Sequence, residues 1–172
     1  MNRYQLAKIV DWAGTLATRK RMQKVVYLLK VAGCPLEADY TLHHYGPYSQ
    51  EVARLTDEMV RTNLLEEKSE TSPFGVQYSY HLPEATKRKL DDYERSTQSR
   101  ELLRGMLPYE DRAKRLINAE LKDLEIAATL VYFRRQDGDW SLAAEKTRQF
   151  KNLDAGSPLL HRAEDLAKQI VS

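Results

Sequence analysis

Apolar residues recur every three or four positions through the first sixty residues, which is the spacing of one buried face of an α-helix. Three such stretches predict helices over residues 2–16, 19–32 and 49–61. Their inward positions are Leu6, Ile9, Val10, Ala13 and Leu16 in the first, Met22, Val25, Val26 and Leu29 in the second, and Val52, Leu55 and Met59 in the third. Gly33 and Pro35 end the second helix.

A short extended segment and a sharp bend precede the third helix. Residues 40–45 (YTLHHY) are rich in β-formers and predict a short strand. Gly46 permits the positive φ of a tight reversal, Pro47 presets its own φ, and Ser49 can cap the following helix. We therefore expect the bend to hold the helix of residues 49–61 with its charged face toward solvent or a partner.

The hydrophobic period changes from helical to alternating after Leu64. Val76, Tyr78, Tyr80 and Leu82 alternate with polar residues, which predicts a β-hairpin over residues 64–82 with a Pro73–Phe74–Gly75 loop. Three helices followed by a hairpin is the order of a winged helix, in which the third helix would be the recognition helix. Tyrosines gather in and beside this hairpin, and we expect half-buried sheet packing from them rather than a base-stacking platform; they are Tyr40, Tyr45, Tyr48, Tyr78 and Tyr80.

The second half of the sequence predicts helices alone. Residues 84–98 are strongly polar and predict a largely exposed helix, whereas a longer apolar pattern runs from Ala113 to Val131, either continuous or broken near Lys122. Further helices are expected over 140–151 and 158–171. The predicted fold is thus mainly α, with a winged-helix-like module at residues 1–82 and a helical bundle at 83–172. The bundle residues Leu116, Leu121, Leu124 and Val131 suit either an internal core or a homodimer contact.

Three segments between Met22 and Glu67 carry a family resemblance: QKVVYLL, YTLHHYGPYSQEV and LTDEMVRTNLLEE. This part of the chain resembles the bacterial YwgA-like proteins and, more distantly, the Panacea domains related to the antitoxin SocA. The resemblance implies a helical or winged-helix module and, in the Panacea case, neutralisation of a toxin encoded beside it. Asn63 stands where the family pattern has Gly, and Asn also tolerates a left-handed backbone.

Composition is that of an ordinary globular protein, with 42% hydrophobic and 30% charged residues. No apolar run is long enough to span a bilayer and no cleavable leader is evident, so we expect a cytoplasmic protein that does not bind membranes. Cys34 is the single cysteine, which excludes an intrachain disulfide. The net charge of +2 hides a polarity, because residues 1–33 carry seven Lys or Arg against one Asp, and residues 34–82 carry three against eight acids.

Duplex DNA is one candidate partner. Basic residues cluster at the start of the second predicted helix, where a helix-turn-helix contacts phosphate; they are Arg19, Lys20, Arg21 and Lys24. The expected recognition helix, however, carries Glu51, Asp57 and Glu58, and a negative reading surface opposes binding to DNA.

A protein is the other candidate partner, and the sequence favours it. The same helix offers an acidic face, flanked by tyrosines, that suits a partner with basic side chains, and Tyr and Arg are common interface anchors. The residues expected to contact the partner are Tyr45, Tyr48, Glu51, Arg54, Glu58 and Arg61. This partner would be a toxin if the Panacea resemblance extends to function.

Catalytic motifs are absent from the sequence. HExxH, CxxC, GxSxG and phosphate-binding Gly loops do not occur, and the adjacent His43 and His44 would point to opposite sides of a strand. A metal site of His44, His81 and Glu51 is the one arrangement left to consider. We expect a non-enzymatic protein without cofactor or metal.

Overall fold

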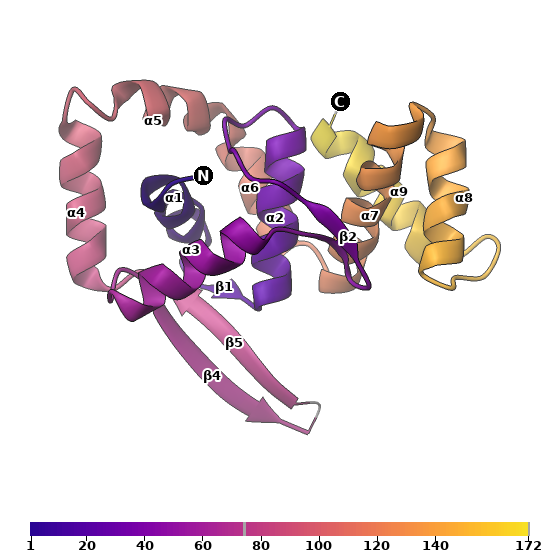
Figure 1. The fold of residues 1–172 in the computed structure, drawn as a ribbon, viewed down its shortest axis with the longest axis horizontal. Helices are drawn as coiled ribbons and strands as arrows, with labels where there is room; N and C mark the ends of the chain where they lie inside the picture. Colours follow the sequence, from indigo (N-terminus) through magenta and orange to yellow (C-terminus); the bar gives the residue numbers. More distant parts are fainter. Residues whose placement is uncertain (74, 172) are drawn as a thin grey trace.

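The first three helices begin at side-chain caps. In the computed structural model, which describes residues 1–73 and 75–171, these helices are α1 (Arg3–Ala13), α2 (Arg19–Val31) and α3 (Gln50–Arg61) (Figure 1). The side chains of Asn2, Thr18 and Ser49 each accept a hydrogen bond from a backbone N–H in the first turn. The helices match the predicted ranges, except that the first stops at Ala13 instead of residue 16.

The early stop of α1 makes room for a short strand. Gly14 takes a φ of +65°, which ends the helix, and Leu16–Ala17 then form β1. β1 pairs with β5 (Gly75–His81), which in turn pairs with β4 (Glu66–Ser72), so that the antiparallel sheet has the order β1-β5-β4. Asn63, between α3 and β4, has a φ of +55°, the left-handed backbone that Asn tolerates.

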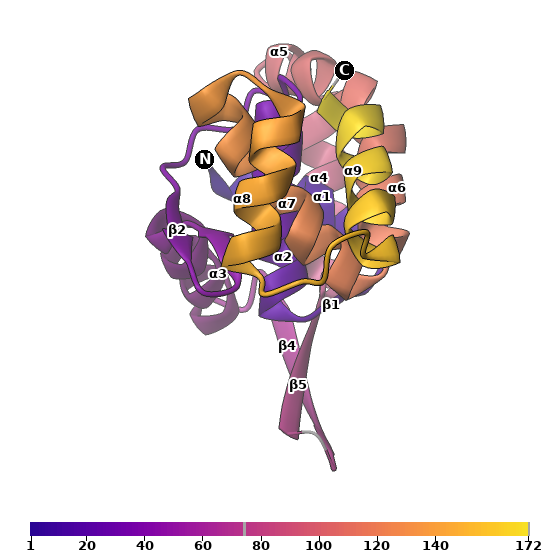
Figure 2. The same cartoon turned by 90° about the vertical axis from the view of Figure 1, so that its right-hand side faces the viewer.

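The predicted hairpin is confirmed, but only its base packs against the body. Tyr80 and Leu82 are buried, whereas Val76 and Tyr78 are 53% and 37% exposed. The β4–β5 hairpin therefore projects away from the helices (Figures 1 and 2). Of the five tyrosines expected to pack half-buried in and beside the hairpin, Tyr80 is fully buried, Tyr78 is 37% exposed and Tyr45 is 51% exposed. Phe74 of the predicted loop lies outside the described residues.

A second, smaller hairpin precedes α3. The strand expected at residues 40–45 is β2 (Thr41–His43), and it pairs with β3 (Gly46–Tyr48) in the register His43↔Gly46. Sequence patterns indicated a bend at Gly46 and Pro47 but not a strand. Pro47 fits there because β3 is an edge strand, where a missing N–H donor is tolerated.

The C-terminal half is helical, as expected. Its elements are α4 (Glu84–Arg95), α5 (Arg100–Met106), the 3-10 turn η1 (Leu107–Tyr109), α6 (Glu110–Asn118), α7 (Leu121–Asp137), α8 (Trp140–Phe150) and α9 (Pro158–Val171). The long apolar pattern is broken between α6 and α7, close to Lys122. α5 was not predicted, since its seven residues are too short for a clear period.

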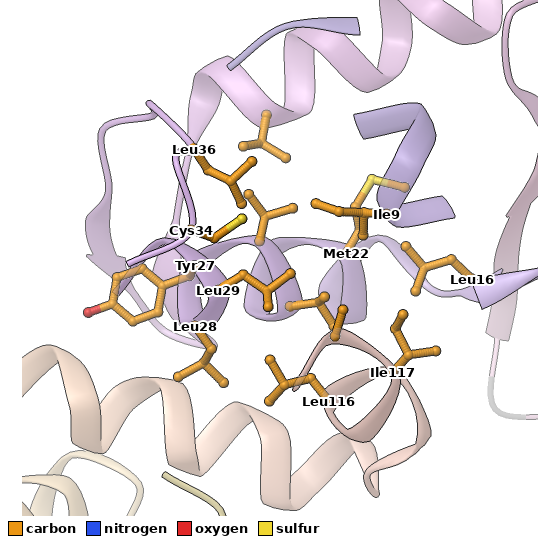
Figure 3. Close-up of a cluster of buried hydrophobic side chains, with 14 of the residues drawn as sticks. Ile9, Leu16, Met22, Tyr27, Leu28, Leu29, Cys34, Leu36, Leu116 and Ile117 are labelled. Atoms are coloured by element: carbon orange, nitrogen blue, oxygen red, sulfur yellow. The ribbon is translucent and has the colours of Figure 1, made fainter. Parts of the chain in front are cut away.

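Side chains from both halves of the chain share one hydrophobic core built around α2. This helix packs against α6, α7 and α9 as well as β3. Figure 3 shows Leu28 of α2 on the side of the helix where Leu116 of α6 lies, and Met22 on the opposite side, beside Ile9 of α1. Leu116, Leu124 and Val131, considered above for a dimer contact, are buried within this same chain. Along the described residues, no helix is both long and apolar enough to cross a bilayer.

Candidate functional site

The segment Gly46–Ser49 is clamped between α2 and α7. Gln23 of α2 makes a reciprocal pair with the backbone of Ser49: its Nε2 donates to the Ser49 oxygen (3.0 Å), and the Ser49 N–H donates to its Oε1 (2.8 Å). On the other side Gly46 has a φ of +93° and lies against Thr129, so close that a Cβ on Gly46 would be 2.6 Å from Thr129 Oγ1. The bend that orients α3 is thus fixed by buried contacts from two helices.

Lys24 lies inside the protein, unlike the surface cation that the sequence indicated. Only 2% of it is exposed, and its Nζ donates to the Pro47 main-chain oxygen at 2.6 Å. Burial is the main reason that its pKa falls to about 8; Glu125 opposes the shift, and the charges of Lys151 and Lys20 add to it. This ammonium supports β3 and does not lie on the outer surface, where a DNA backbone could contact it.

The other three cations of the expected DNA-binding cluster also have internal partners. Arg19 donates to the Tyr80 hydroxyl (2.7 Å) and to the Glu67 carboxylate (2.8 Å), and it forms an ion pair with Asp57 (3.2 Å). Arg21 donates to the main-chain oxygen of Ile117 (2.7 Å) and to that of Ala119.

Lys20 is held by looser contacts than the other three cations. Its Nζ lies 3.6 Å from the centre of the Tyr45 ring and 3.6 Å from the Glu125 carboxylate, and its side chain remains 44% exposed. The basic cluster is therefore a set of tertiary contacts with one partly free ammonium, rather than an open cationic patch.

The exposed face of α3 is less acidic in effect than its sequence suggests. Glu51 accepts a hydrogen bond from the Asp39 N–H (3.0 Å), and Glu58 forms an ion pair with Arg3 of α1. Arg54 and Arg61, one on each side of Asp57, are exposed and have no hydrogen-bond or ionic partner within the described part of the chain. These two guanidinium groups are the charges that α3 leaves available.

The two flanking tyrosines differ in their surroundings. Tyr48 stacks on His43 with ring centres 4.8 Å apart, whereas Tyr45 at the tip of the β2–β3 turn is 51% exposed. Together these rings border a pocket of about 260 Å³ between the start of α2, the β2–β3 hairpin and the first half of α3. The structure thus brings Tyr45 and Tyr48 together with Lys20 and Lys24, residues that the sequence assigned to alternative partners.

The histidines do not gather into a metal site. His81 pairs with Glu66 across the base of the hairpin (3.1 Å), and His43 contacts Thr41 through its Nε2 (3.1 Å). Among residues 1–73 and 75–171, no three His, Cys, Asp or Glu side chains lie close enough to hold a metal ion.

Sequence reasoning missed Gln23, Glu125 and Thr129. A signal was present for two of them: Glu125 and Thr129 are polar residues four positions apart in the apolar run of α7, and therefore on one helix face. Buried polar groups in such a run usually have a specific hydrogen-bond partner. Here Glu125 pairs with Lys20 of α2, and Thr129 lies against Gly46 of β3.

Lys24 should give the protein a distinctive dependence of stability on pH. Below pH 8 the Lys24 ammonium is charged in both the folded and the unfolded protein, so its burial lowers the folding stability by the full amount. Above the ordinary lysine pKa of 10.5 the amine is neutral in both the folded and the unfolded protein, and this loss of stability disappears. Lys24 therefore destabilises less as the pH rises through this window. We expect wild type to gain about 2 kcal/mol relative to Lys24→Met between pH 7 and pH 9.5.

Urea unfolding of both proteins at a series of pH values measures this difference. Because both proteins contain the same buried tyrosines and Cys34, their titrations cancel. Parallel stability curves for wild type and Lys24→Met would contradict the assignment of a depressed pKa to Lys24.

The fold and this site define a mainly helical protein with two small antiparallel sheets. No protein-family model matches the sequence. The chain is similar to the uncharacterized protein YwgA of Bacillus subtilis (strain 168), with 29% identity over 129 residues, which is 75% of this chain and 72% of that protein. The similarity extends well beyond residues 22–67 and supports the resemblance to YwgA-like proteins.

Proposed function

We propose that this protein is a non-enzymatic, cytoplasmic interaction protein that presents α3 and the β4–β5 hairpin to a protein partner. The observation that carries the proposal is the pairing pattern of the charges. Three of the four cations expected to bind DNA, Arg19, Arg21 and Lys24, donate hydrogen bonds within their own chain. In contrast, Arg54 and Arg61 of α3 are exposed and unpaired among the described residues. Arginine is a frequent anchor of protein interfaces.

The arrangement of the first 82 residues supports a winged-helix-like display. The chain forms three helices, with β1 between the first two and the β4–β5 hairpin after the third. The three strands make one sheet of order β1-β5-β4. In a winged helix this places α3 as the recognition helix and the hairpin as the wing. The hairpin projects beyond the body (Figure 2), and it exposes Val76 and Tyr78, which add apolar contact area near the start of α2.

The charges of this surface favour a protein over DNA. β4 exposes Glu66 and Glu70 with one Lys68, in addition to Glu67, which pairs with Arg19. Phosphates would be repelled by these carboxylates, since most nonspecific DNA affinity comes from phosphate neutralisation. A protein surface can match a mixed pattern with its own charges. By the Panacea resemblance, we propose that the partner is a toxin encoded in a neighbouring reading frame.

Reversing the two unpaired arginines tests the proposal. Arg54→Glu with Arg61→Glu should weaken capture of the neighbouring gene product at least tenfold and abolish relief of any growth arrest that it causes. The reason is that two interface anchors become repulsive. Co-purification, titration of the purified pair and growth of co-expressing cells measure these effects.

The matched control is Arg104→Glu on α5, an exposed arginine on an element remote from α3 (Figure 1). This variant should capture the neighbouring gene product and relieve growth arrest as well as wild type does. Unchanged capture by the α3 double variant, with the fold intact, would rule out α3 as the contact surface.

Duplex DNA is the second candidate, favoured by the winged-helix order of the elements. In that case affinity should fall steeply with salt, and the α3 double variant should weaken binding. Reversal of Arg19 or Lys20 should weaken binding to all DNA sequences alike. A flat response to salt eliminates this candidate.

A further inference from the structure

The pocket beside the β2–β3 hairpin has the surroundings of a ligand site. Its apolar part is formed by Met22 of α2 and Ala53 of α3, and aromatic rings are supplied by His43, Tyr45 and Tyr48. Its volume of about 260 Å³ lies below the range of ~300–1,000 Å³ that is usual for drug-sized ligands. The space therefore suits a small molecule with about one ring.

Positive charge is in excess around this pocket. Lys20, Lys24 and Lys151 all interact electrostatically with a single buried carboxylate, that of Glu125. Lys151 donates to the His44 main-chain oxygen (3.1 Å) and so contacts the turn between β2 and β3. Lys20 and Lys24 line the pocket itself. One carboxylate cannot neutralise three ammonium groups, so the site is complementary to an anion.

Lys24 also has donor capacity that the described residues do not use. An ammonium group carries three N–H donors, and the structure supplies one acceptor, the Pro47 oxygen. The residue as a whole is only 2% exposed, and buried donors are usually satisfied. An anionic oxygen in the pocket would provide the missing acceptor.

We infer that this pocket binds a small planar organic anion, a single aromatic ring bearing a carboxylate or a phosphate. The anionic group would meet Lys20 and Lys24, and the ring would lie among Tyr45, Tyr48 and Met22. Aromatic side chains favour a planar ring through stacking, and the desolvated lysines favour a charged oxygen over a neutral one. This inference does not depend on the proposed partner, although the pocket also touches α3 through Ala53 and Thr56.

Calorimetric titration of the purified chain tests the inference. The probes are 4-hydroxybenzoate and phenyl phosphate, with benzyl alcohol as the neutral ring and inorganic phosphate as the anion without a ring. We expect saturable binding of at least one aromatic anion, at least tenfold tighter than the matching control compound. Binding of the carboxylate alone, the phosphate alone or both identifies the anionic group within the proposed class.

Two exposed side chains serve as the site variants, because Lys24→Met also alters the support of β3. Lys20→Gln and Tyr45→Ala should each weaken binding at least tenfold, whereas Lys87→Gln on α4, an exposed lysine away from the pocket, should not. The inference is overturned if neither aromatic anion binds, if benzyl alcohol or inorganic phosphate binds as tightly, or if both site variants bind like wild type.

Discussion

Replacing Gly46 with alanine is expected to destabilise the protein by about 3 kcal/mol, from a left-handed backbone penalty of ~1–2 kcal/mol and an overpacking penalty of similar size. The φ of +93° disfavours any residue with a Cβ. The added methyl would lie 2.6 Å from Thr129 Oγ1 and 3.4 Å from the Glu125 main-chain oxygen. The latter belongs to α7 and cannot move without disturbing the helix.

Gly138→Ala is the matched control for the backbone penalty. Gly138 ends α7 with a φ of +74°, and its nearest neighbour in the direction of a Cβ is the flexible end of Arg134 at 3.8 Å. Alanine there should cost only about 1 kcal/mol. Urea unfolding measures both losses.

A double-mutant cycle separates the clash at Gly46 from the backbone strain. Thr129→Ala removes the nearest clashing atom, so Gly46→Ala should be less damaging in that background by about 1 kcal/mol or more. Equal losses at Gly46 and Gly138, with no coupling to Thr129, would show that α7 does not constrain the bend.

Gln23→Ala should destabilise by about 3 kcal/mol, since it leaves two buried backbone groups of Ser49 without partners at ~1–3 kcal/mol each. Gln23 and Ser49 are both buried, so water cannot replace the lost bonds without opening the site. Unfolding by urea measures the loss, and the exposed Gln136→Ala should cost less than about 0.5 kcal/mol.

Gln23→Met distinguishes hydrogen bonding from packing at this position. Methionine fills a similar volume but cannot bond to the Ser49 backbone. We expect most of the loss to persist in Gln23→Met. Wild-type stability of that variant would mean that packing, not the reciprocal hydrogen bonds, anchors the start of α3.

Local periodicity accounts for what the sequence revealed of the fold. Each of the features that were predicted is a pattern among residues that lie close together in the sequence. These features are the three N-terminal helices, the 64–82 hairpin and the break near Lys122. β3 and α5 escaped prediction because three and seven residues carry too little pattern. Pro47 also argued against a strand, because proline is typical of a break in a strand unless the strand lies at the edge of a sheet.

The surroundings of the site residues could not be predicted in the same way. The partners of Arg21 and Lys24 are residues distant in the sequence. Arg21 donates to main-chain oxygens at the end of α6, and Lys24 donates to a main-chain oxygen of β3. A run of basic residues at a helix start looks the same whether its partners are phosphates or main-chain oxygens. By contrast, the outward position of Arg54 and Arg61 followed from the inward period of Val52 and Met59.

The projecting hairpin has one further consequence, which concerns association between copies of the chain. β4 is an edge strand, and an open edge on a protruding ribbon is a template for pairing with another molecule. Glu66, Glu67, Lys68 and Glu70 occupy four of its seven positions. The excess of carboxylates on β4 disfavours the close approach of a second β4 and so works against edge-to-edge pairing of the ribbon.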